Sequence, residues 1–465
     1  MEGKTKDCLD AVEGLLLQGD IDSPFHGVSI NSRTVSKGEL FICIKGERFD
    51  GHDFLAEVVS KEVAGVILSD SEKVPHEPGR GKEPFVIQVR DTLKALQDLA
   101  GFQRNRLPFQ VVAITGTNGK STTKEMVASI LETKFKTFKT QGNLNNHIGL
   151  PLTLLKKEPA HEVGVLEMGM SSAGEIKRLA EIAQPDIGVI TNISEGHLVQ
   201  LKSIKDVQSA KGELFDALTE KNTAIVNADD PLVLELTQSL RARTVTFGID
   251  QPADVRASEI ESRGNLGFQF KVKIFDKTLS IRLPYLGYCN IYNTLAALAT
   301  GYSLGIQEEA MARGLKNYKI MAQRNEQIGH KGIDLINDAY NANPRSMTEA
   351  IKTLDNFKTR GKRILVIGDM LELGGLSVPA HQKLGEEIAH SRTDILITVG
   401  KLAGLAAKSV QAVSGGRIRV YEFTNHQEAA AFLCREAVSG DCAMFKGSRG
   451  ATMEKVLQIF VANKN

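Results

Sequence analysis

One segment of seven residues has the types and spacing that phosphate binding requires. It directly follows Thr115, at the end of an apolar run, and consists of Gly116, Thr117, Asn118, Gly119, Lys120, Ser121 and Thr122. Glycines let the backbone curl so that N–H groups converge on one anion, and a helix that starts behind them adds partial positive charge. Lys120 would reach the β- and γ-phosphates, and the Ser121 hydroxyl can bind Mg²⁺. The commoner motif has a glycine where this chain has Ile114, but the strand, turn and helix pattern still predicts a site for ATP and Mg²⁺.

Two further polar residues follow strands that are expected at the same edge of a sheet. Glu167 ends the apolar run 163–166, and His197 lies in the loop after the run 187–190. Ligands bind at the carboxyl ends of the strands in such sheets. Mg²⁺ prefers oxygen ligands and seldom has a full protein cage, so Glu167 is a candidate ligand and His197 a second candidate at this edge. The alternative for Glu167 is a simple helix cap.

Lys211 is placed where burial is expected. In the predicted helix 204–218, it lies four residues after Val207 and three before Leu214, on the apolar face. One interpretation is that the aliphatic stem packs while the ammonium reaches solvent. The other is that burial lowers the pKa of the amine, which then takes part in chemistry or is modified. The sequence leaves both interpretations open.

The elements that must position these residues indicate an α/β fold in three domains. We expect them at residues 1–89, 90–316 and 317–465. The first is a small α/β domain with apolar runs at 40–44 and 65–68, and a helix capped by Asp91 leads out of it. The last alternates strands and helices as in a doubly wound, Rossmann-like domain. Its strands are expected at 333–336, 364–367, 395–399 and 443–445.

The middle domain is expected to hold a parallel sheet that is covered on both faces, because continuous apolar strands alternate with helices. These strands are expected at 111–114, 163–166, 187–190 and 224–226. Between residues 244 and 283 polar and apolar residues alternate, which indicates antiparallel strands added at the edge of the sheet. A helix rich in alanine, 293–300, closes the domain.

The composition excludes several classes of protein. The chain has 465 residues, 42% hydrophobic and 24% charged, and a net charge of +1, which gives no broad attraction to nucleic acid or lipid. The start of the sequence has no apolar core of a secretion signal, and no apolar run is long enough to cross a bilayer. Five scattered cysteines indicate reduced thiols. We therefore expect a cytoplasmic, monomeric enzyme without a nucleic-acid partner or membrane insertion.

Several further motifs extend along the whole chain. They are 46–54 (GERFDGHDF), 142–149 (GNLNNHIG), 167–170 (EMGM), 338–344 (DAYNANP), 368–374 (GDMLELG) and 446–450 (KGSRG). Together with the phosphate loop, they resemble the Mur ligases of peptidoglycan synthesis. The phosphate loop alone is shared with folylpolyglutamate synthases, whereas the asparagine-rich segment and DAYNANP favour the Mur ligases. The family usually has His-Asn where this chain has Cys289-Asn290.

The resemblance implies a UDP-binding first domain, a central ATPase and a Rossmann-like third domain that closes over the nucleotide. It implies that ATP, with two Mg²⁺ ions, converts the carboxylate of UDP-N-acetylmuramoyl-tripeptide to an acyl phosphate, which the amine of D-alanyl-D-alanine attacks. The third peptide residue, lysine or diaminopimelate, stays open. The alternatives are another amide-forming ligase of the same chemistry, such as a folylpolyglutamate synthase or a different Mur enzyme, and a nucleotide-driven switch.

The resemblance also assigns residues. Lys120, Glu167, His197 and Lys211 would be catalytic, with Lys211 carbamylated to bind a second Mg²⁺. The expected metal ligands are Ser121, Glu167, His197 and Lys211. The nucleotide would contact Asn290 and Asn293 near the adenine, Arg324 near the phosphates and Asp338 near the ribose. The substrate would contact Asn31, Ser32, Arg33, Lys45, Gly46, Phe49, Asp50, Gly51, His52, Asn145, Asn146, Tyr340 and Asn341.

Overall fold

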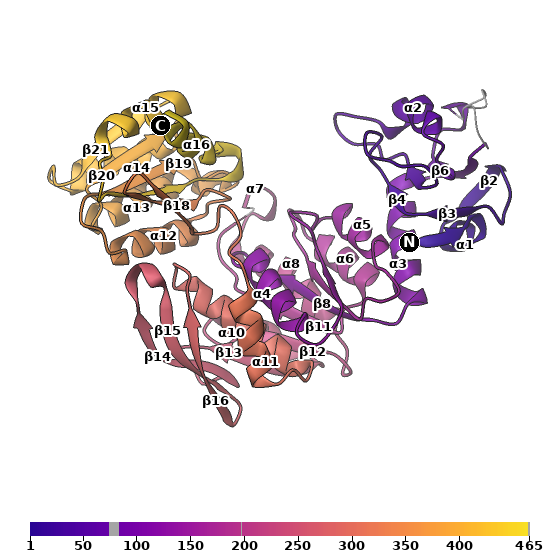
Figure 1. Cartoon of the computed structure of the whole chain (residues 1–465), viewed down its shortest axis with the longest axis horizontal. Helices are drawn as coiled ribbons and strands as arrows, with labels where there is room; N and C mark the ends of the chain where they lie inside the picture. The colour runs from indigo at the N-terminus through magenta and orange to yellow at the C-terminus, as the bar shows by residue number, and fades with distance from the viewer. Residues whose placement is uncertain (74–82, 197, 464–465) are drawn as a thin grey trace.

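The chain folds into three lobes, each built around its own sheet. The computed structural model describes residues 1–73, 83–196 and 198–463. Figure 1 shows the lobes in chain order, with the central lobe between the N-terminal and C-terminal ones. Within the described residues, no helix is long and apolar enough to span a membrane. All five cysteines are free thiols, as expected.

The N-terminal lobe contains a five-stranded sheet in the order β2-β7-β6-β5-β4. Its strands are β2 (Gly14–Gln18), β4 (Val28–Ser29), β5 (Leu40–Ile42), β6 (Gly65–Leu68) and β7 (Phe85–Val89). A small sheet of β1 (Glu2–Lys4) and β3 (Pro24–His26) and the helices α1 (Thr5–Ala11) and α2 (Leu55–Ser60) complete the lobe. β4, β5, β6 and β7 pair in parallel, so the loops after β4 and β5 leave the sheet at the same edge.

Helix α3 (Thr92–Arg106) connects this lobe to the central one. As the sequence predicts, Asp91 caps the helix, and its carboxylate accepts hydrogen bonds from the N–H groups of Leu93 at 2.8 Å and Lys94 at 3.0 Å. The apolar face of α3 joins a core cluster that extends from the N-terminal lobe into the central sheet. The two lobes therefore share buried surface.

The central lobe has a nine-stranded sheet in the order β16-β15-β14-β13-β12-β11-β8-β10-β9. Its strands are β8 (Gln110–Thr115), β9 (Thr137–Lys139), β10 (Val163–Glu167), β11 (Ile187–Ile190), β12 (Thr223–Asn227), β13 (Arg243–Gly248), β14 (Val255–Ser262), β15 (Phe268–Ile274) and β16 (Lys277–Leu283). The expected antiparallel strands are present at one edge, β14 with β15 and β15 with β16. The expectation was wrong for β13, which pairs in parallel with both neighbours.

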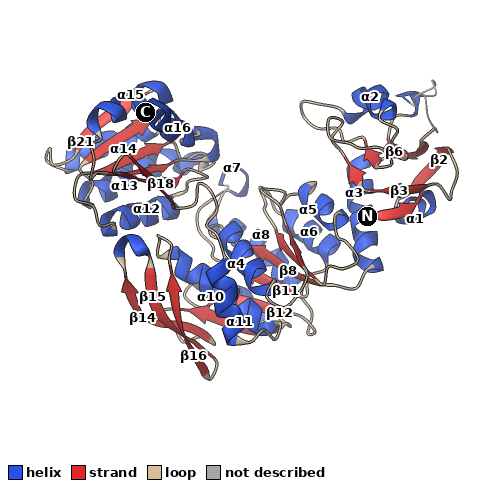
Figure 2. Ribbon diagram, viewed as in Figure 1, coloured by secondary structure: helices blue, strands red, loops and turns tan. Residues whose placement is uncertain are grey.

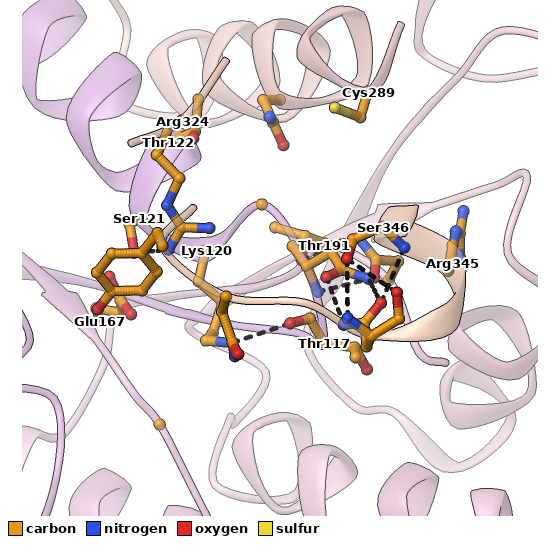
Figure 3. Close-up of a pocket in the computed structure, with 18 of the residues that line it drawn as sticks. Thr117, Lys120, Ser121, Thr122, Glu167, Thr191, Cys289, Arg324, Arg345 and Ser346 are labelled. Carbon is orange, nitrogen blue, oxygen red and sulfur yellow. Dashed lines mark hydrogen bonds between the residues drawn. The ribbon is translucent and has the colours of Figure 1, made fainter. Parts of the chain in front are cut away.

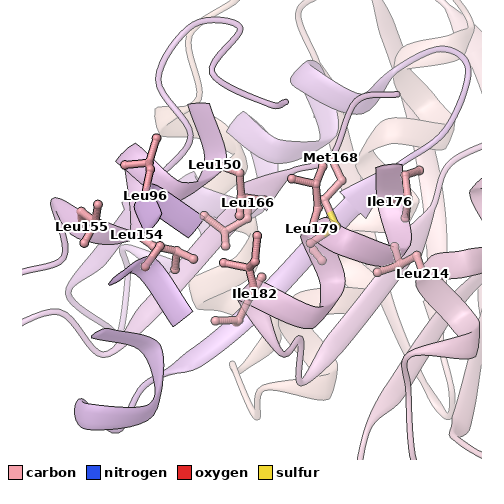
Figure 4. Packing of buried hydrophobic residues seen from close by; sticks show 14 of the residues in the cluster. Leu96, Leu150, Leu154, Leu155, Leu166, Met168, Ile176, Leu179, Ile182 and Leu214 are labelled. Atoms are coloured by element: carbon pink, nitrogen blue, oxygen red, sulfur yellow. The ribbon is translucent and has the colours of Figure 1, made fainter. Parts of the chain in front are cut away.

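Helices cover both faces of the central sheet (Figure 2). On one face lie α4 (Lys120–Leu131), α10 (Cys289–Ser303) and α11 (Glu308–Asn317). On the other lie α3, α5 (Gly149–Leu155), α6 (Glu175–Ala183) and α8 (Ile204–Asp216), with the short helices α7 (Leu198–Leu201) and α9 (Pro231–Glu235) nearby. Figure 4 shows how leucine and isoleucine side chains of this second face interlock. The sheet is thus buried on both sides, as its apolar strands require.

The C-terminal lobe is the second doubly wound domain that the sequence predicts. Its sheet has the order β17-β18-β22-β19-β20-β21, and only β17 is antiparallel. The strands are β17 (Glu326–His330), β18 (Ile333–Asp338), β19 (Arg363–Gly368), β20 (Ile395–Val399), β21 (Arg419–Phe423) and β22 (Cys442–Lys446). The helices are α12 (Pro344–Asn356), α13 (Ser377–His390), α14 (Ala403–Val413), α15 (His426–Glu436) and α16 (Glu454–Asn463).

Candidate active site

A cavity of about 540 Å³ lies between the central and C-terminal lobes. The phosphate loop, Glu167 and Lys211 line it from the central lobe, and residues of the DAYNANP motif line it from the C-terminal lobe. Figure 3 shows Lys120 and Glu167 of the central lobe and Arg345 and Ser346 of the C-terminal lobe among the side chains that line it. Its size is typical of sites for small ligands. Residues that are distant in the sequence therefore meet in one place.

The phosphate loop joins β8 to α4, and two of its glycines are required by its geometry. Gly116 has φ +146° and Gly119 has φ +81°, in a region that disfavours other residues. A Cβ on Gly116 would lie 1.9 Å from Oγ1 of Thr191, and one on Gly119 would lie 2.3 Å from Oδ1 of Asn293. The loop can therefore curl only with glycine at both positions. The first N–H groups of α4 then face the cavity without partners inside the helix.

The segment after β11 holds the phosphate loop from the side. Thr191 donates its hydroxyl hydrogen to the backbone oxygen of Asn118 at 2.6 Å. The side chain of Asn192 bonds Asn118 twice, because Oδ1 accepts from its N–H at 3.0 Å and Nδ2 donates to its oxygen at 2.9 Å. Thr191 and Asn192 were not among the predicted site residues, although their place at a strand end of the same edge could have indicated them.

Two lysine amines meet at one backbone oxygen of the phosphate loop. Nζ of Lys120 donates to Gly116 O at 2.8 Å, and Nζ of Lys211 donates to the same oxygen at 3.0 Å. Lys211 is only 1% exposed, so its ammonium does not reach solvent. Burial, with a contribution from Lys120, holds the pKa of Lys211 well below its ordinary value. Of the two interpretations of Lys211, the one in which the ammonium reaches solvent is therefore wrong, and a part of the amine in the chemistry stays a prediction.

Burial also lowers the pKa of Lys120. The nearby carboxylate of Glu167 opposes this change, whereas Arg324 adds to it. Lys120 therefore lies among charged groups on both sides of the cavity, in the position expected for a residue that contacts phosphate.

One carboxylate oxygen of Glu167 has no hydrogen-bond partner among the described residues. The residue is 2% exposed, and its Oε1 accepts a hydrogen bond from Nδ2 of Asn145 at 2.8 Å. Its Oε2 is buried without a partner among the described residues. A buried carboxylate oxygen without a partner is costly, and a bound cation would satisfy it. The second predicted ligand at this edge, His197, lies outside the described residues, which contain no group of three or more His, Cys, Asp or Glu around a metal position.

The residues expected at the adenine lie on α10 and face the phosphate loop. Asn293 is 5% exposed, and its Oδ1 accepts from Thr123 Oγ1 at 3.2 Å. Its Nδ2 donates to Oδ1 of Asn290, and Asn290 in turn donates to Leu286 O at 2.6 Å. Burial raises the pKa of the neighbouring Cys289 thiol to about 12. This thiol stays protonated at neutral pH, so it does not replace the basic imidazole of the histidine that the family usually has at this position.

Arg324 crosses from the connection between the lobes to the phosphate loop. Its guanidinium lies 3.9 Å from the ring centre of Tyr340, and it donates to Ser121 Oγ at 3.5 Å. Asp338 also lines the cavity, where its carboxylate accepts from Lys446 Nζ at 2.5 Å. Asn341 lies beside them and accepts from the backbone N–H of Arg449 at 3.3 Å. The structure thus brings these predicted residues to one wall of the cavity.

The two predicted asparagines of the GNLNNHIG motif have different partners. Asn145 contacts Glu167, as described above, and lines the cavity. Oδ1 of Asn146 accepts from the N–H groups of Ile148 at 3.2 Å and Gly149 at 2.9 Å, at the start of α5. Asn146 therefore also organises its own loop.

The remaining predicted substrate residues lie in the N-terminal lobe, apart from this cavity. They follow β4 and β5 at the same sheet edge and comprise Asn31, Ser32 and Arg33 after β4 and Lys45, Gly46, Phe49, Asp50, Gly51 and His52 after β5. Phe49 is 69% exposed at the loop tip. His52 is buried, with Nδ1 2.5 Å from Asp50 and Nε2 accepting from Ser69 N–H at 3.0 Å, so it supports the loop from inside.

Three other side chains of the site were missed. Lys124 and Thr140 are fully buried behind Glu167, and Asn343 exchanges hydrogen bonds with Asn118 across the two lobes. A signal for Lys124 was available, because it lies three residues before Val127 and seven before Leu131 on the apolar face of α4. Nothing local in the sequence indicates the partners of Thr140 or Asn343.

Family models match the chain in three consecutive parts. The model "Mur ligase family, catalytic domain" matches residues 24–104, "Mur ligase middle domain" matches 114–301, and "Mur ligase, glutamate ligase domain" matches 323–449. The matches therefore cover parts of all three lobes.

Individual proteins are similar over nearly the whole length. UDP-N-acetylmuramoyl-tripeptide--D-alanyl-D-alanine ligase of Bacillus subtilis (strain 168) is 38% identical over 97% of this chain and 97% of its own. A crystal structure of MurF from Acinetobacter baumannii covers 99% of both chains with a TM-score of 0.90 and 30% identity. The MurF ligase of Thermotoga maritima, solved in complex with ADP, covers 94% of this chain and 98% of its own with a TM-score of 0.80 and 27% identity.

Proposed function

The chain belongs to the Mur ligase family, and on this premise we propose that it joins D-alanyl-D-alanine to UDP-N-acetylmuramoyl-tripeptide in an ATP-dependent reaction of peptidoglycan precursor synthesis. The proposal rests on one observation about the cavity. The phosphate loop, Glu167 and polar residues of the C-terminal lobe line a single cavity, and Oε2 of Glu167 has no partner within the part of the chain that the structure describes. Such a cavity can hold a nucleotide and the reacting groups of two further substrates.

The chemistry consists of two displacements. A carboxylate oxygen of the tripeptide attacks the γ-phosphorus of ATP, the bond from that phosphorus to the bridging oxygen breaks, and ADP leaves. The amine nitrogen of D-alanyl-D-alanine then attacks the carbonyl carbon of the acyl phosphate, loses a proton, and phosphate leaves. Lys120 and Arg324 lie at the phosphate loop and would neutralise charge on the transferred group.

The residues present fit Mg²⁺. Oε2 of Glu167 is buried without a partner among the described residues, and Ser121, in the first turn of α4, lines the same cavity, so both can offer oxygen ligands. When bound there, Mg²⁺ would supply positive charge against the phosphates. We propose His197 as a further ligand, on the grounds of its position in the chain.

A second Mg²⁺ requires a change at Lys211. We propose that its uncharged amine adds to CO₂, which forms an N–C bond and releases a proton. The resulting carbamate carries oxygens that suit Mg²⁺. The low pKa of Lys211 supports this step, because only the uncharged amine is nucleophilic.

The proposed roles of the three domains follow the lobes. Residues 1–89 would hold the UDP end through the loops after β4 and β5, with Phe49 exposed for contact. Residues 90–316 would bind ATP, with Asn290 and Asn293 near the adenine. Residues 317–465 would close the site, with Asp338 near the ribose and Tyr340, Asn341, Asn145 and Asn146 near the tripeptide or the amine. We propose a cytoplasmic monomer, since its nucleotide substrates are cytoplasmic compounds.

Substitution of Lys120 tests the proposed role of the phosphate loop. Lys120→Ala should lower ligation by at least about 10²–10³-fold, because a group that stabilises transferred charge is lost. Binding of UDP-N-acetylmuramoyl-tripeptide should stay within about twofold, since its UDP end lies in another lobe.

Ligation is measured by phosphate release and binding by titration calorimetry. Lys134→Ala is the matched control, because Lys134 follows the same helix and its Nζ donates to Gly305 O at 3.0 Å, outside the cavity. Wild-type turnover of Lys120→Ala would refute the role of this lysine.

A further inference from the structure

Two separate elements carry the oxygens that face the proposed metal position. Ser121 lies in the first turn of α4, and Glu167 ends β10. The distance between the Ser121 hydroxyl and the Glu167 carboxylate must stay fixed if both are to contact one ion. We propose that Lys124 and Thr140 are positioning residues that hold Glu167 against α4. This inference rests on the proposed function, because it concerns the same metal position.

Lys124 forms the link on the side of the helix. Its side chain is fully buried, and Nζ donates to the backbone oxygen of Thr140 at 2.7 Å. Nζ also lies 3.0 Å from Oε1 of Glu125, which in turn pairs with Lys139 at 2.5 Å. A buried ammonium is costly unless it is bonded in this way, and an apolar side chain of similar length would avoid the cost. The bond to Thr140 and the ion pair with Glu125 are therefore what a lysine contributes here, and only the bond to Thr140 leads toward Glu167.

Thr140 continues the link to the strand. It is fully buried directly after β9, and its N–H donates to Val165 O at 3.0 Å. Its Oγ1 accepts from the backbone N–H of Glu167 at 3.0 Å. One residue thus connects α4, through Lys124, to the backbone of the proposed ligand.

The same loop also fixes the carboxylate. Five residues after Thr140, Asn145 donates Nδ2 to Oε1 of Glu167 at 2.8 Å and accepts at its backbone oxygen from Gly169 N–H at 2.9 Å. Oε1 is thereby engaged, and Oε2 is the oxygen left without a described partner. The orientation of Glu167 follows from contacts at both its backbone and its side chain.

Lys124 and Thr140 do not line the cavity, whereas Ser121, Asn145 and Glu167 do. They can therefore affect the proposed metal position only through other residues, and their contacts lead to Glu167. Outer residues that orient metal ligands typically change metal affinity or activity by about 10–100-fold when they are replaced. A purely structural role would instead lower stability without changing the dependence on Mg²⁺.

The test compares ADP binding with and without Mg²⁺ by titration calorimetry on the full chain. Lys124→Met removes the link to Thr140 together with the ion pair to Glu125, whereas Thr140→Val removes only the hydroxyl that accepts from Glu167. In both variants the gain in ADP affinity that Mg²⁺ gives should fall by about 10-fold, and the Mg²⁺ concentration for half-maximal phosphate release should rise by about 10-fold. ADP affinity without Mg²⁺ should stay within about twofold, because the phosphate loop is unchanged.

Two controls make the result specific. Thr140→Ser keeps the hydroxyl and should stay within about twofold of the wild type. Lys362→Met removes a partly buried lysine of the C-terminal lobe, which donates to Glu436 O at 2.7 Å and pairs with Asp441 at 3.4 Å, and it should leave the effect of Mg²⁺ unchanged.

An unchanged effect of Mg²⁺ in folded Thr140→Val would overturn the inference, and so would an equal loss of ADP affinity with and without Mg²⁺. If Lys124→Met does not fold, Thr140→Val and Thr140→Ser decide the question. The proposed function fails separately, if the wild-type chain itself binds ADP without any gain from Mg²⁺.

Discussion

The backbone oxygen of Gly116 accepts hydrogen bonds from both Lys120 and Lys211, so two amines share one small volume. Two adjacent ammonium ions repel each other, and burial adds to the cost for Lys211. The folded protein therefore binds fewer protons at Lys211 than the unfolded chain does at pH values between the lowered pKa and the ordinary value of 10.5. Across that window the folded state gains stability as the pH rises.

Lys211→Met should therefore stabilise the protein while it abolishes ligation. The gain should be about 1–3 kcal/mol at pH 6, because an unfavourably buried amine is removed, and it should shrink as the pH approaches 10. Urea unfolding at pH 6, 7.5 and 9 measures the difference between variant and wild type.

Lys205→Met is the control for Lys211→Met. It lies on the same helix, with a side chain that is 63% exposed and paired with Glu235, so its removal should have little effect at any pH. A Lys211→Met variant that is less stable than the wild type at pH 6 would contradict the assignment of an uncharged amine.

At the scale of residues, the sequence indicated that Lys211 lies where burial is expected, because a lysine on an apolar helix face is conspicuous. Lys124 is equally conspicuous, because it lies on the apolar face of α4. The sequence could not predict that Oε2 of Glu167 lacks a partner among the described residues, because this depends on which of the two oxygens Asn145 contacts. Partners such as Thr140 are brought near by strand pairing, and no local pattern reveals them.

At the scale of elements, the start of α12 is tied to the phosphate loop. Asn343 caps α12, where its Oδ1 accepts from Ser346 N–H at 2.9 Å. The same side chain exchanges hydrogen bonds with the amide of Asn118, at 2.7 Å and 3.3 Å. A helix of the C-terminal lobe therefore contacts the loop that would hold the phosphates.

Asn343→Ser should weaken ATP binding while it preserves α12. Serine still caps a helix, but it is too short to reach Asn118. The loss of the contact should raise the KM for ATP by about 3–10-fold, the value of one or two ordinary hydrogen bonds. Steady-state phosphate release at saturating concentrations of the other substrates measures this change.

The matched control is Asn425→Ser, because Asn425 caps α15 in the same way, through Glu428 N–H at 2.9 Å. It should leave the KM for ATP unchanged. Asn118→Ala and the double variant complete the cycle, and the effects should not add, since both remove one contact. Fully additive effects would show that the two amides are not coupled.

Among the elements, long apolar strands were predicted well, and helix ends less so. Helix α10 was expected at residues 293–300 but begins at Cys289 and ends at Ser303. Asn290 is therefore in its first turn, bonded back to Leu286 O. β13 was assigned to the antiparallel group because polar and apolar residues alternate along it. It pairs in parallel, however, and alternation of side chains alone does not distinguish parallel from antiparallel strands.

At the scale of the whole molecule, we propose a separate task for each of the three lobes. The loops proposed for the UDP end lie in the N-terminal lobe, which the central lobe separates from the C-terminal lobe (Figure 1). The phosphate loop lines the cavity between the central and C-terminal lobes. A substrate held at both places must extend from one lobe to the next. The sequence could predict three domains but not their contacts, such as the pair of Asn118 and Asn343, which are 225 positions apart.

One measurement tests the central claim, that this chain forms an amide bond with D-alanyl-D-alanine at the expense of ATP. The protein is incubated with ATP, Mg²⁺ and UDP-N-acetylmuramoyl-tripeptide, with D-alanyl-D-alanine or L-glutamate as the amine, and product mass and phosphate are recorded. The claim predicts a product equal to tripeptide plus dipeptide less one water, one phosphate per product, and little phosphate with L-glutamate or without an amine. A glutamate adduct, or rapid phosphate release without both small substrates, would contradict it.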